Sequence, residues 1–168
     1  SGLLAEAFAS LGQDRLDQAA EAYRKLEKIS ASDGAAGLAD LALYEGRFGD
    51  AVRILQKSVA ADVAAGRPDA AADKYAALAY TELLRGQKGP ALKAANAALA
   101  ISKAVKTRFL AARVFIAGGE AARARQLADG LGSELRIEPQ AYAKLLEGEA
   151  ALKGGDGRRA VKLFTEAN

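Results

Sequence analysis

Apolar residues recur along the chain at the three- and four-residue spacing of amphipathic helices, and short polar breaks separate the runs. The clearest example is the stretch LADLALYEGRFGDAVRILQKSVAAD, in which Leu38 and Leu41 precede a break at Gly46, whereas Ala51 and Leu55 follow it. This spacing places the apolar side chains on one face of each helix. The stretch therefore predicts two amphipathic helices joined by a tight turn.

The same pattern of turn and small residue occurs five times along the chain. The small residues of successive second helices are separated by 32, 40, 33 and 36 positions. They are Ala19, Ala51, Ala91, Ala124 and Ala160. A recurrence with this period indicates repeated supersecondary units that bury their apolar faces against one another.

This recurrence resembles the tetratricopeptide repeat (TPR), a helix–turn–helix unit of about 34 residues with an Ala-x3-Phe signature in its second helix. Ala160 and Phe164 match that signature, and Tyr75, Leu78 and Ala79 match the Trp-x2-Leu-Gly positions of a first helix. The first unit carries a turn one residue longer than the TPR consensus. TPR arrays that follow kinase or cyclase domains in large bacterial signalling proteins are similar to the stretches LALYEGRFGDAVRIL and KAVKTRFLAARVF.

The resemblance implies an all-α fold, a right-handed solenoid of about five antiparallel helical hairpins in a single TPR-like domain. The expected units span residues 1–31, 32–66, 67–102, 103–136 and 137–168. The chain starts at Ser1 without Met and ends at Asn168 within a helical pattern, so we expect it to be part of a longer protein. Its last helix presents Val161, Leu163 and Phe164, which predicts a surplus apolar strip and weak self-association through this end.

Hydrophobic residues make up 51% of the 168 residues but aromatic residues only 6%, so alanine supplies much of the apolar content. Alanine is the best helix former, and this composition favours an all-helical class. The chain has no cysteine and no histidine, which excludes thiolate and imidazole nucleophiles and the usual zinc sites. We therefore expect no cofactor, no bound metal and no catalysis. No apolar run reaches the roughly 18 residues of a membrane span, and no signal peptide is visible.

The net charge is only +3, but basic residues are concentrated in residues 83–128. This segment holds nine basic residues against Glu120 alone, a balance of +8. We expect a coherent positive surface around the fourth unit and a preference for an acidic protein or peptide partner. Nucleic acid is an alternative partner because lysine and arginine neutralise phosphates, but the segment lacks interleaved exposed aromatic residues.

In TPR proteins similar to this chain, the first helix of each unit lines a concave surface. Carried over residue by residue, the resemblance implies a partner-binding groove formed by Asp40, Tyr44, Tyr80, Leu84, Lys106, Phe109, Arg113, Tyr142, Glu149 and Lys153. The four aromatic residues would present contact area to a partner, or would instead pack between neighbouring units. Arg113 beside Lys106 would hold a carboxylate, or would instead belong to a solvated basic face.

These observations predict a non-catalytic module or scaffold that binds a protein or peptide on the concave face. One alternative is a regulatory or sensor region of a bacterial Ser/Thr kinase-type or cyclase-type signalling protein, and a second is a nucleic-acid-binding helical array.

The run Gly154–Arg159 lacks the G-x4-G-K-[ST] pattern of a phosphate loop, so we expect an ordinary interhelical turn there. For the compartment we favour the cytoplasm, with the periplasm as the alternative if the parent protein is a membrane receptor.

Overall fold

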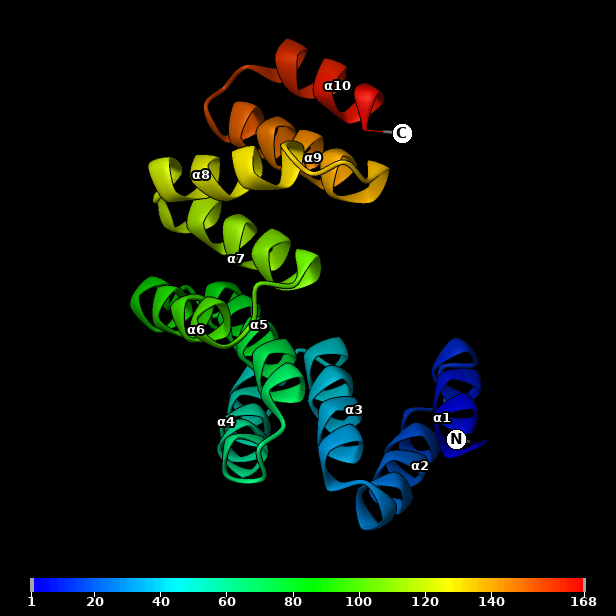
Figure 1. Ribbon diagram of the computed structural model, residues 1–168. Helices are drawn as coiled ribbons and strands as arrows, with labels where there is room; N and C mark the ends of the chain where they lie inside the picture. The colour runs from blue at the N-terminus through cyan, green and yellow to red at the C-terminus, as the bar shows by residue number, and fades with distance from the viewer. Residues whose placement is uncertain (1, 168) are drawn as a thin grey trace.

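Ten α-helices form the part of the chain that the computed structural model describes, residues 2–167 (Figure 1). No strand occurs among these residues. The helices are α1 (Gly2–Gly12), α2 (Leu16–Ile29), α3 (Ala31–Tyr44), α4 (Phe48–Ala64), α5 (Pro68–Leu84), α6 (Lys88–Ile101), α7 (Val105–Gly118), α8 (Ala121–Gly132), α9 (Ile137–Lys153) and α10 (Gly157–Glu166). This is the all-α class that the periodicity and the alanine-rich composition predict.

The helices pair into five hairpins, α1–α2, α3–α4, α5–α6, α7–α8 and α9–α10, and each hairpin packs on the next. The second helix of one hairpin contacts the first helix of the following one. The first helices also contact one another directly, α3 with α5, α5 with α7, and α7 with α9. The chain is therefore a solenoid of helical hairpins, as the repeat pattern predicts.

Every hairpin uses the same turn, in which one residue with positive φ lies five positions before the aligned alanine of the second helix. These residues are Asp14, Gly46, Gly86, Gly119 and Gly155, with φ of 56°, 72°, 73°, 92° and 85°. The amide of the following residue donates to a carbonyl five positions earlier, as from Arg47 to Ala42. A left-handed residue with this hydrogen bond ends a helix and satisfies its last carbonyl groups.

The first turn corrects one expectation from the sequence. It is not longer than the others, because Asp14 takes the left-handed conformation that glycine takes elsewhere. Aspartate tolerates this conformation better than most residues because its short polar side chain can bond locally. Gly66, with φ of 66°, repeats the turn between α4 and α5. Because α4 and α5 each have 17 residues, the spacing between Ala51 and Ala91 extends to 40 positions.

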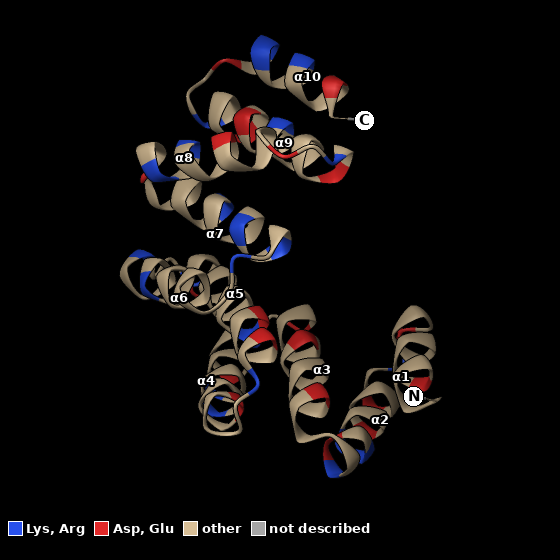
Figure 2. Cartoon of the chain, in the orientation of Figure 1, with Lys and Arg blue, Asp and Glu red and all other residues tan. Residues whose placement is uncertain are grey.

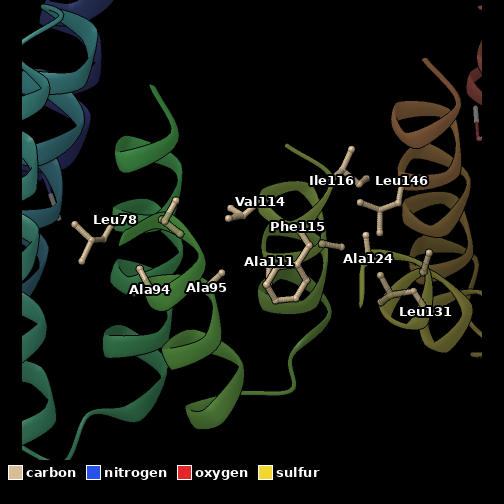
Figure 3. Packing of buried hydrophobic residues seen from close by; sticks show 14 of the residues in the cluster. Leu78, Ala94, Ala95, Ala111, Val114, Phe115, Ile116, Ala124, Leu131 and Leu146 are labelled. Carbon is tan, nitrogen blue, oxygen red and sulfur yellow. The ribbon is translucent and has the colours of Figure 1, made fainter. Parts of the chain in front are cut away.

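The aligned alanines lie at the helix crossings and are almost completely buried. Their exposed fractions are 0% for Ala19, Ala51 and Ala91, 4% for Ala124 and 1% for Ala160. A small residue here lets the two helices of a hairpin approach closely, so the predicted register of small residues is confirmed. Larger side chains such as Phe115, Leu131 and Leu146 fill a continuous core that runs from α3 to α9 (Figure 3).

The N-terminal hairpin has a core of its own. Ala7, Tyr23, Leu26 and Leu41 belong to a second cluster, separate from the main one. Helix α2 packs against α3, whereas α1 lies beyond contact distance of α3, and Figure 1 shows the two helices standing apart. The regular stacking of first helices that runs from α3 to α9 is therefore absent between α1 and α3.

Two glycines of α3 allow α2 to lie close against it. A Cβ added at Gly37 would lie 2.1 Å from Cδ1 of Tyr23, and one at Gly34 would lie 2.3 Å from the Cα of Glu27. No side chain fits at these distances, so the α2–α3 junction depends on both glycines.

Candidate partner-binding groove

The ten residues predicted to line the groove lie on α3, α5, α7 and α9, the first helices of four successive hairpins. Seven of these side chains are exposed: Asp40, Tyr44, Tyr80, Leu84, Lys106, Arg113 and Lys153. The other three, Phe109, Tyr142 and Glu149, are half-buried. Lys106 of α7 pairs with Asp73 of α5 at 3.1 Å, and its charge acts on Asp40 of α3. We call the surface formed by these ten predicted residues the groove face.

The four aromatic residues of the groove face divide into two pairs with different roles. Phe109 and Tyr142 stack on each other across α7 and α9, with ring centroids 4.5 Å apart and an interplanar angle of 25°. These two rings pack between neighbouring units. Tyr44 and Tyr80 remain open to solvent, with exposed fractions of 66% and 48%. For the second pair, the interpretation as contact area for a partner stays a prediction.

The basic residues of the groove face already have partners within the fold. Arg113 Nε lies 2.8 Å from a Glu149 carboxylate oxygen, and Lys106 is paired with Asp73. The Lys153 ammonium donates to the backbone carbonyls of Ile116 and Ala117 at the end of α7. A carboxylate from a partner would have to compete with these contacts for Lys106 and Arg113.

The positive charge of the basic segment 83–128 is also partly neutralised by carboxylates outside it. Four of its nine cations form ion pairs with carboxylates of neighbouring helices and loops: Arg85 with Glu82, Lys106 with Asp73, Arg108 with Glu134, and Arg113 with Glu149. Arg123 packs its guanidinium 4.0 Å from the centre of the Phe115 ring. Figure 2 shows blue segments on α7 close to red segments on its neighbours. The +8 balance along the sequence therefore overstates the free positive charge at the surface.

Asp40 contrasts with these paired residues. It is exposed, and no cation of residues 2–167 lies within 4 Å of its carboxylate. Burial among the surrounding helices raises the pKa of the Asp40 carboxyl, and the positive charge of Lys106 partly offsets this effect. Burial also raises the pKa of Tyr23 on α2, and the negative charge of Asp40 adds to that shift.

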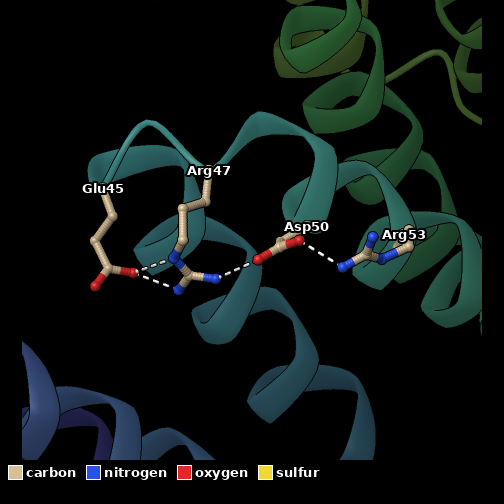
Figure 4. A network of polar contacts seen from close by, with 4 residues as sticks. All are labelled: Glu45, Arg47, Asp50 and Arg53. Atoms are coloured by element: carbon tan, nitrogen blue, oxygen red, sulfur yellow. Dashed lines mark hydrogen bonds and ion pairs between the residues drawn. The ribbon is translucent and has the colours of Figure 1, made fainter.

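Next to Tyr44, the turn between α3 and α4 carries a chain of ion pairs (Figure 4). The Arg47 guanidinium donates to Glu45 and, at 2.6 Å, to Asp50, and Asp50 also accepts from Arg53. The negative charges of Glu45 and Asp50 are therefore both balanced by neighbouring arginines. These contacts add little stability, because exposed ion pairs are typically worth about 0–1 kcal/mol.

A polar cluster is buried where α3, α4 and α5 meet. The Lys74 ammonium donates to Asp62 Oδ2 and to the Ser32 hydroxyl, both at 2.6 Å, and Arg67 lies 2.8 Å from the other Asp62 oxygen. Burial would raise the pKa of Asp62, but hydrogen bonds from Lys74 and Ser32 and the charges of Lys74 and Arg67 outweigh it and lower the pKa. The cluster joins the second and third hairpins.

The run Gly154–Arg159 forms the turn between α9 and α10, as the sequence predicts. The Asp156 carboxylate accepts a hydrogen bond from the Arg159 amide at 3.0 Å and caps α10. An amide that a phosphate loop would offer to an anion is thus occupied by the chain's own carboxylate.

Two hollows lie near the C-terminal hairpins. One of about 560 Å³ is lined mainly by residues of α8 and α9, such as Ala124 and Ala150, and also by Arg125 and Arg159. None of the ten predicted groove residues lines it. The other, about 650 Å³, lies beside Val161 and Phe164.

Across the described residues 2–167, no group of three or more acidic side chains is arranged to hold a metal ion, and no helix is both long and apolar enough to cross a membrane.

No protein-family model matches the chain, and no curated protein matches it either. The stacked hairpins of residues 2–167 define an all-α, TPR-like helical-repeat fold. Two crystal structures of MamA share this fold. One superposes with a TM-score of 0.65 over 96% of this chain and 91% of the MamA chain, and the other with 0.63 over 98% and 87%. Sequence identity is 22% in both cases, so the likeness establishes the fold.

Proposed function

We propose that this chain is a non-catalytic scaffold that binds a protein or peptide segment on its groove face. The exposure of Tyr44, Tyr80 and Leu84 supports this most directly, at 66%, 48% and 46%. Large apolar side chains are more often buried, and aromatic residues are preferred anchors in protein interfaces. Leu152 of α9, which is 60% exposed, adds apolar surface on the helix at the other end of the groove.

The part of the groove face formed by α7 and α9 supports this proposal in a different way. The Phe109–Tyr142 stack, the Arg113–Glu149 ion pair and the bonds from Lys153 tie the two helices together without a ligand. A surface that is already rigid loses less conformational entropy when a partner binds, so the entropic cost of binding is smaller. TPR-like solenoids present such surfaces to other proteins, and the fold shared with MamA is of this kind.

The finer expectations from the sequence stay predictions. An acidic partner would rely on Lys88, Lys93, Lys103 and Arg125, which form no ion pair within residues 2–167. A regulatory role beside a kinase or cyclase domain and a role in nucleic-acid binding have no support from the likeness to MamA, which concerns the fold.

Selection of a displayed random peptide library against the full chain tests the proposal. The enriched peptides are then titrated against the double variant Tyr44→Ser/Tyr80→Ser by fluorescence anisotropy. We expect affinity to fall by about tenfold or more, since interface aromatic residues carry much of the binding energy. The matched control is Leu135→Ser, a 99% exposed apolar residue on the α8–α9 connection. Peptides that tolerate the double variant but fail to bind Leu135→Ser would contradict the proposal.

A further inference from the structure

Asp40 is the one charged side chain of the groove face with no hydrogen-bond or ion-pair partner among residues 2–167. Lys106, Arg113 and Glu149 form ion pairs, and Lys153 donates to backbone carbonyls. The repeat explains the difference. Arg113 finds Glu149 at the equivalent position of the next hairpin, whereas the residue at that position after Asp40 is Tyr80, which carries no charge.

The exposed apolar residues of the groove face lie beside this unpaired carboxylate. Asp40 and Tyr44 are one turn apart on α3, and Tyr80 and Leu84 are one turn apart on α5, which contacts α3. We call these four residues the α3–α5 patch. A segment that packs on Tyr44 therefore also covers Asp40.

Covering Asp40 with an uncharged segment would be unfavourable. A carboxylate removed from water needs a hydrogen-bonding or charged partner, and Lys106, whose charge acts on Asp40, is already paired with Asp73 at 3.1 Å. The surroundings also raise the pKa of Asp40, so this group is partly desolvated before any partner arrives. A lysine or arginine of the partner would supply the missing charge and could also stack on a tyrosine ring.

We infer that the segment bound by the α3–α5 patch carries a lysine or arginine that pairs with Asp40, next to an apolar side chain that packs on the tyrosines. This inference rests on the proposed function and specifies its partner as basic. The local charges agree. Helix α3 carries two aspartates and no basic residue, and the one basic residue of α5, Lys74, is buried against Asp62.

Three fluorescein-labelled peptides test the inference. They share the same leucine positions and carry lysine, glutamine or glutamate at all other positions. Anisotropy titrations use the full chain, Asp40→Asn, Asp40→Lys, and the control Asp129→Asn, an exposed carboxylate of α8 with the same charge change. Because the chain as a whole carries +3, non-specific attraction works against the lysine peptide. Tyr44→Ser is measured with all three peptides.

We expect the lysine peptide to bind most tightly and the glutamate peptide most weakly. Asp40→Asn should weaken the lysine peptide by about tenfold, as for loss of one partly exposed charge pair, and Asp129→Asn should not. Asp40→Lys should shift the preference toward the glutamate peptide. If Tyr44→Ser weakens binding but Asp40→Asn leaves the lysine peptide unaffected, or if the glutamate peptide binds best, the inference is wrong and the groove proposal stands. If no peptide responds to Tyr44→Ser, the proposed function itself fails.

Discussion

Replacing Lys74 by methionine should destabilise the chain by several kcal/mol. Asp62 has no exposed side-chain surface, and Lys74 donates to it from 2.6 Å. Removing one member of a buried ion pair typically costs about 3–5 kcal/mol, because the other charge stays buried without compensation. Arg67 still lies 2.8 Å from Asp62 in the variant, so we expect a loss near the lower end, about 3 kcal/mol. This is a large share of the roughly 5–15 kcal/mol that stabilises a typical domain.

Urea unfolding followed by circular dichroism measures this loss, with two comparisons. Lys106→Met breaks an ion pair whose members are 65% and 54% exposed, and should cost at most about 1 kcal/mol. The double variant Asp62→Leu/Lys74→Met removes both buried charges and should recover most of the loss. A cost for Lys74→Met no greater than that for Lys106→Met would show that the buried cluster does not hold α3, α4 and α5 together.

The pH dependence gives a second check on the same cluster. An aspartate in the unfolded chain has a pKa of about 3.9, and the pKa of Asp62 is lower than this in the folded chain. The ion pair of Asp62 therefore contributes its full stability at pH values above the unfolded-state pKa. The contribution is lost as pH falls through the folded-state pKa. In Lys74→Met the Asp62 carboxylate loses its main partner and stays buried as an uncompensated charge. Protonating Asp62 removes that charge, so acid should reduce the destabilisation caused by the substitution. The difference in unfolding free energy between wild type and variant should therefore shrink from neutral to acidic pH.

Three further outcomes follow from the structure. Gly37→Ala should cost about 1–3 kcal/mol in a denaturant melt because its Cβ would meet the Tyr23 ring, whereas Gly49→Ala, which faces open space, should be neutral or slightly stabilising. Of the apolar strip predicted on α10, Leu163 is buried with 6% exposure, whereas Val161 is 67% exposed. Self-association through this end stays a prediction: sedimentation over a concentration series should show a weak effect that Val161→Ser reduces, and a wild type that stays monomeric throughout would disprove it. Binding of the lysine peptide should weaken as acid protonates Asp40, at a higher pH than for an ordinary aspartate, and Asp40→Asn should abolish that dependence.

Periodicity and small-residue spacing were enough to predict the hairpins, because each helix must bury one apolar face and each crossing needs a small side chain. The sequence did not distinguish Tyr44 from Tyr142, since both are aromatic residues of first helices. Only the packing shows that one ring is open and the other stacks on Phe109. The first turn was misjudged because Asp14 takes a conformation normally assigned to glycine. Lys74 was missed because a buried lysine requires partners from two other helices.

To find which charges stay unpaired in this fold, equivalent positions of successive repeats must be compared. Summing the charges along the sequence does not show this. Lys106 pairs with Asp73, 33 positions earlier, and Arg113 with Glu149, 36 positions later, which are the spacings of one repeat. Part of a run of cations in one hairpin is thus neutralised by carboxylates of its neighbours. A groove residue keeps a free charge where the equivalent position of the next repeat carries no counter-charge. By this criterion the free charge of the groove face is the carboxylate of Asp40, beside exposed tyrosines. The basic segment of the sequence favours an acidic partner, whereas the paired charges of the folded groove favour a basic one.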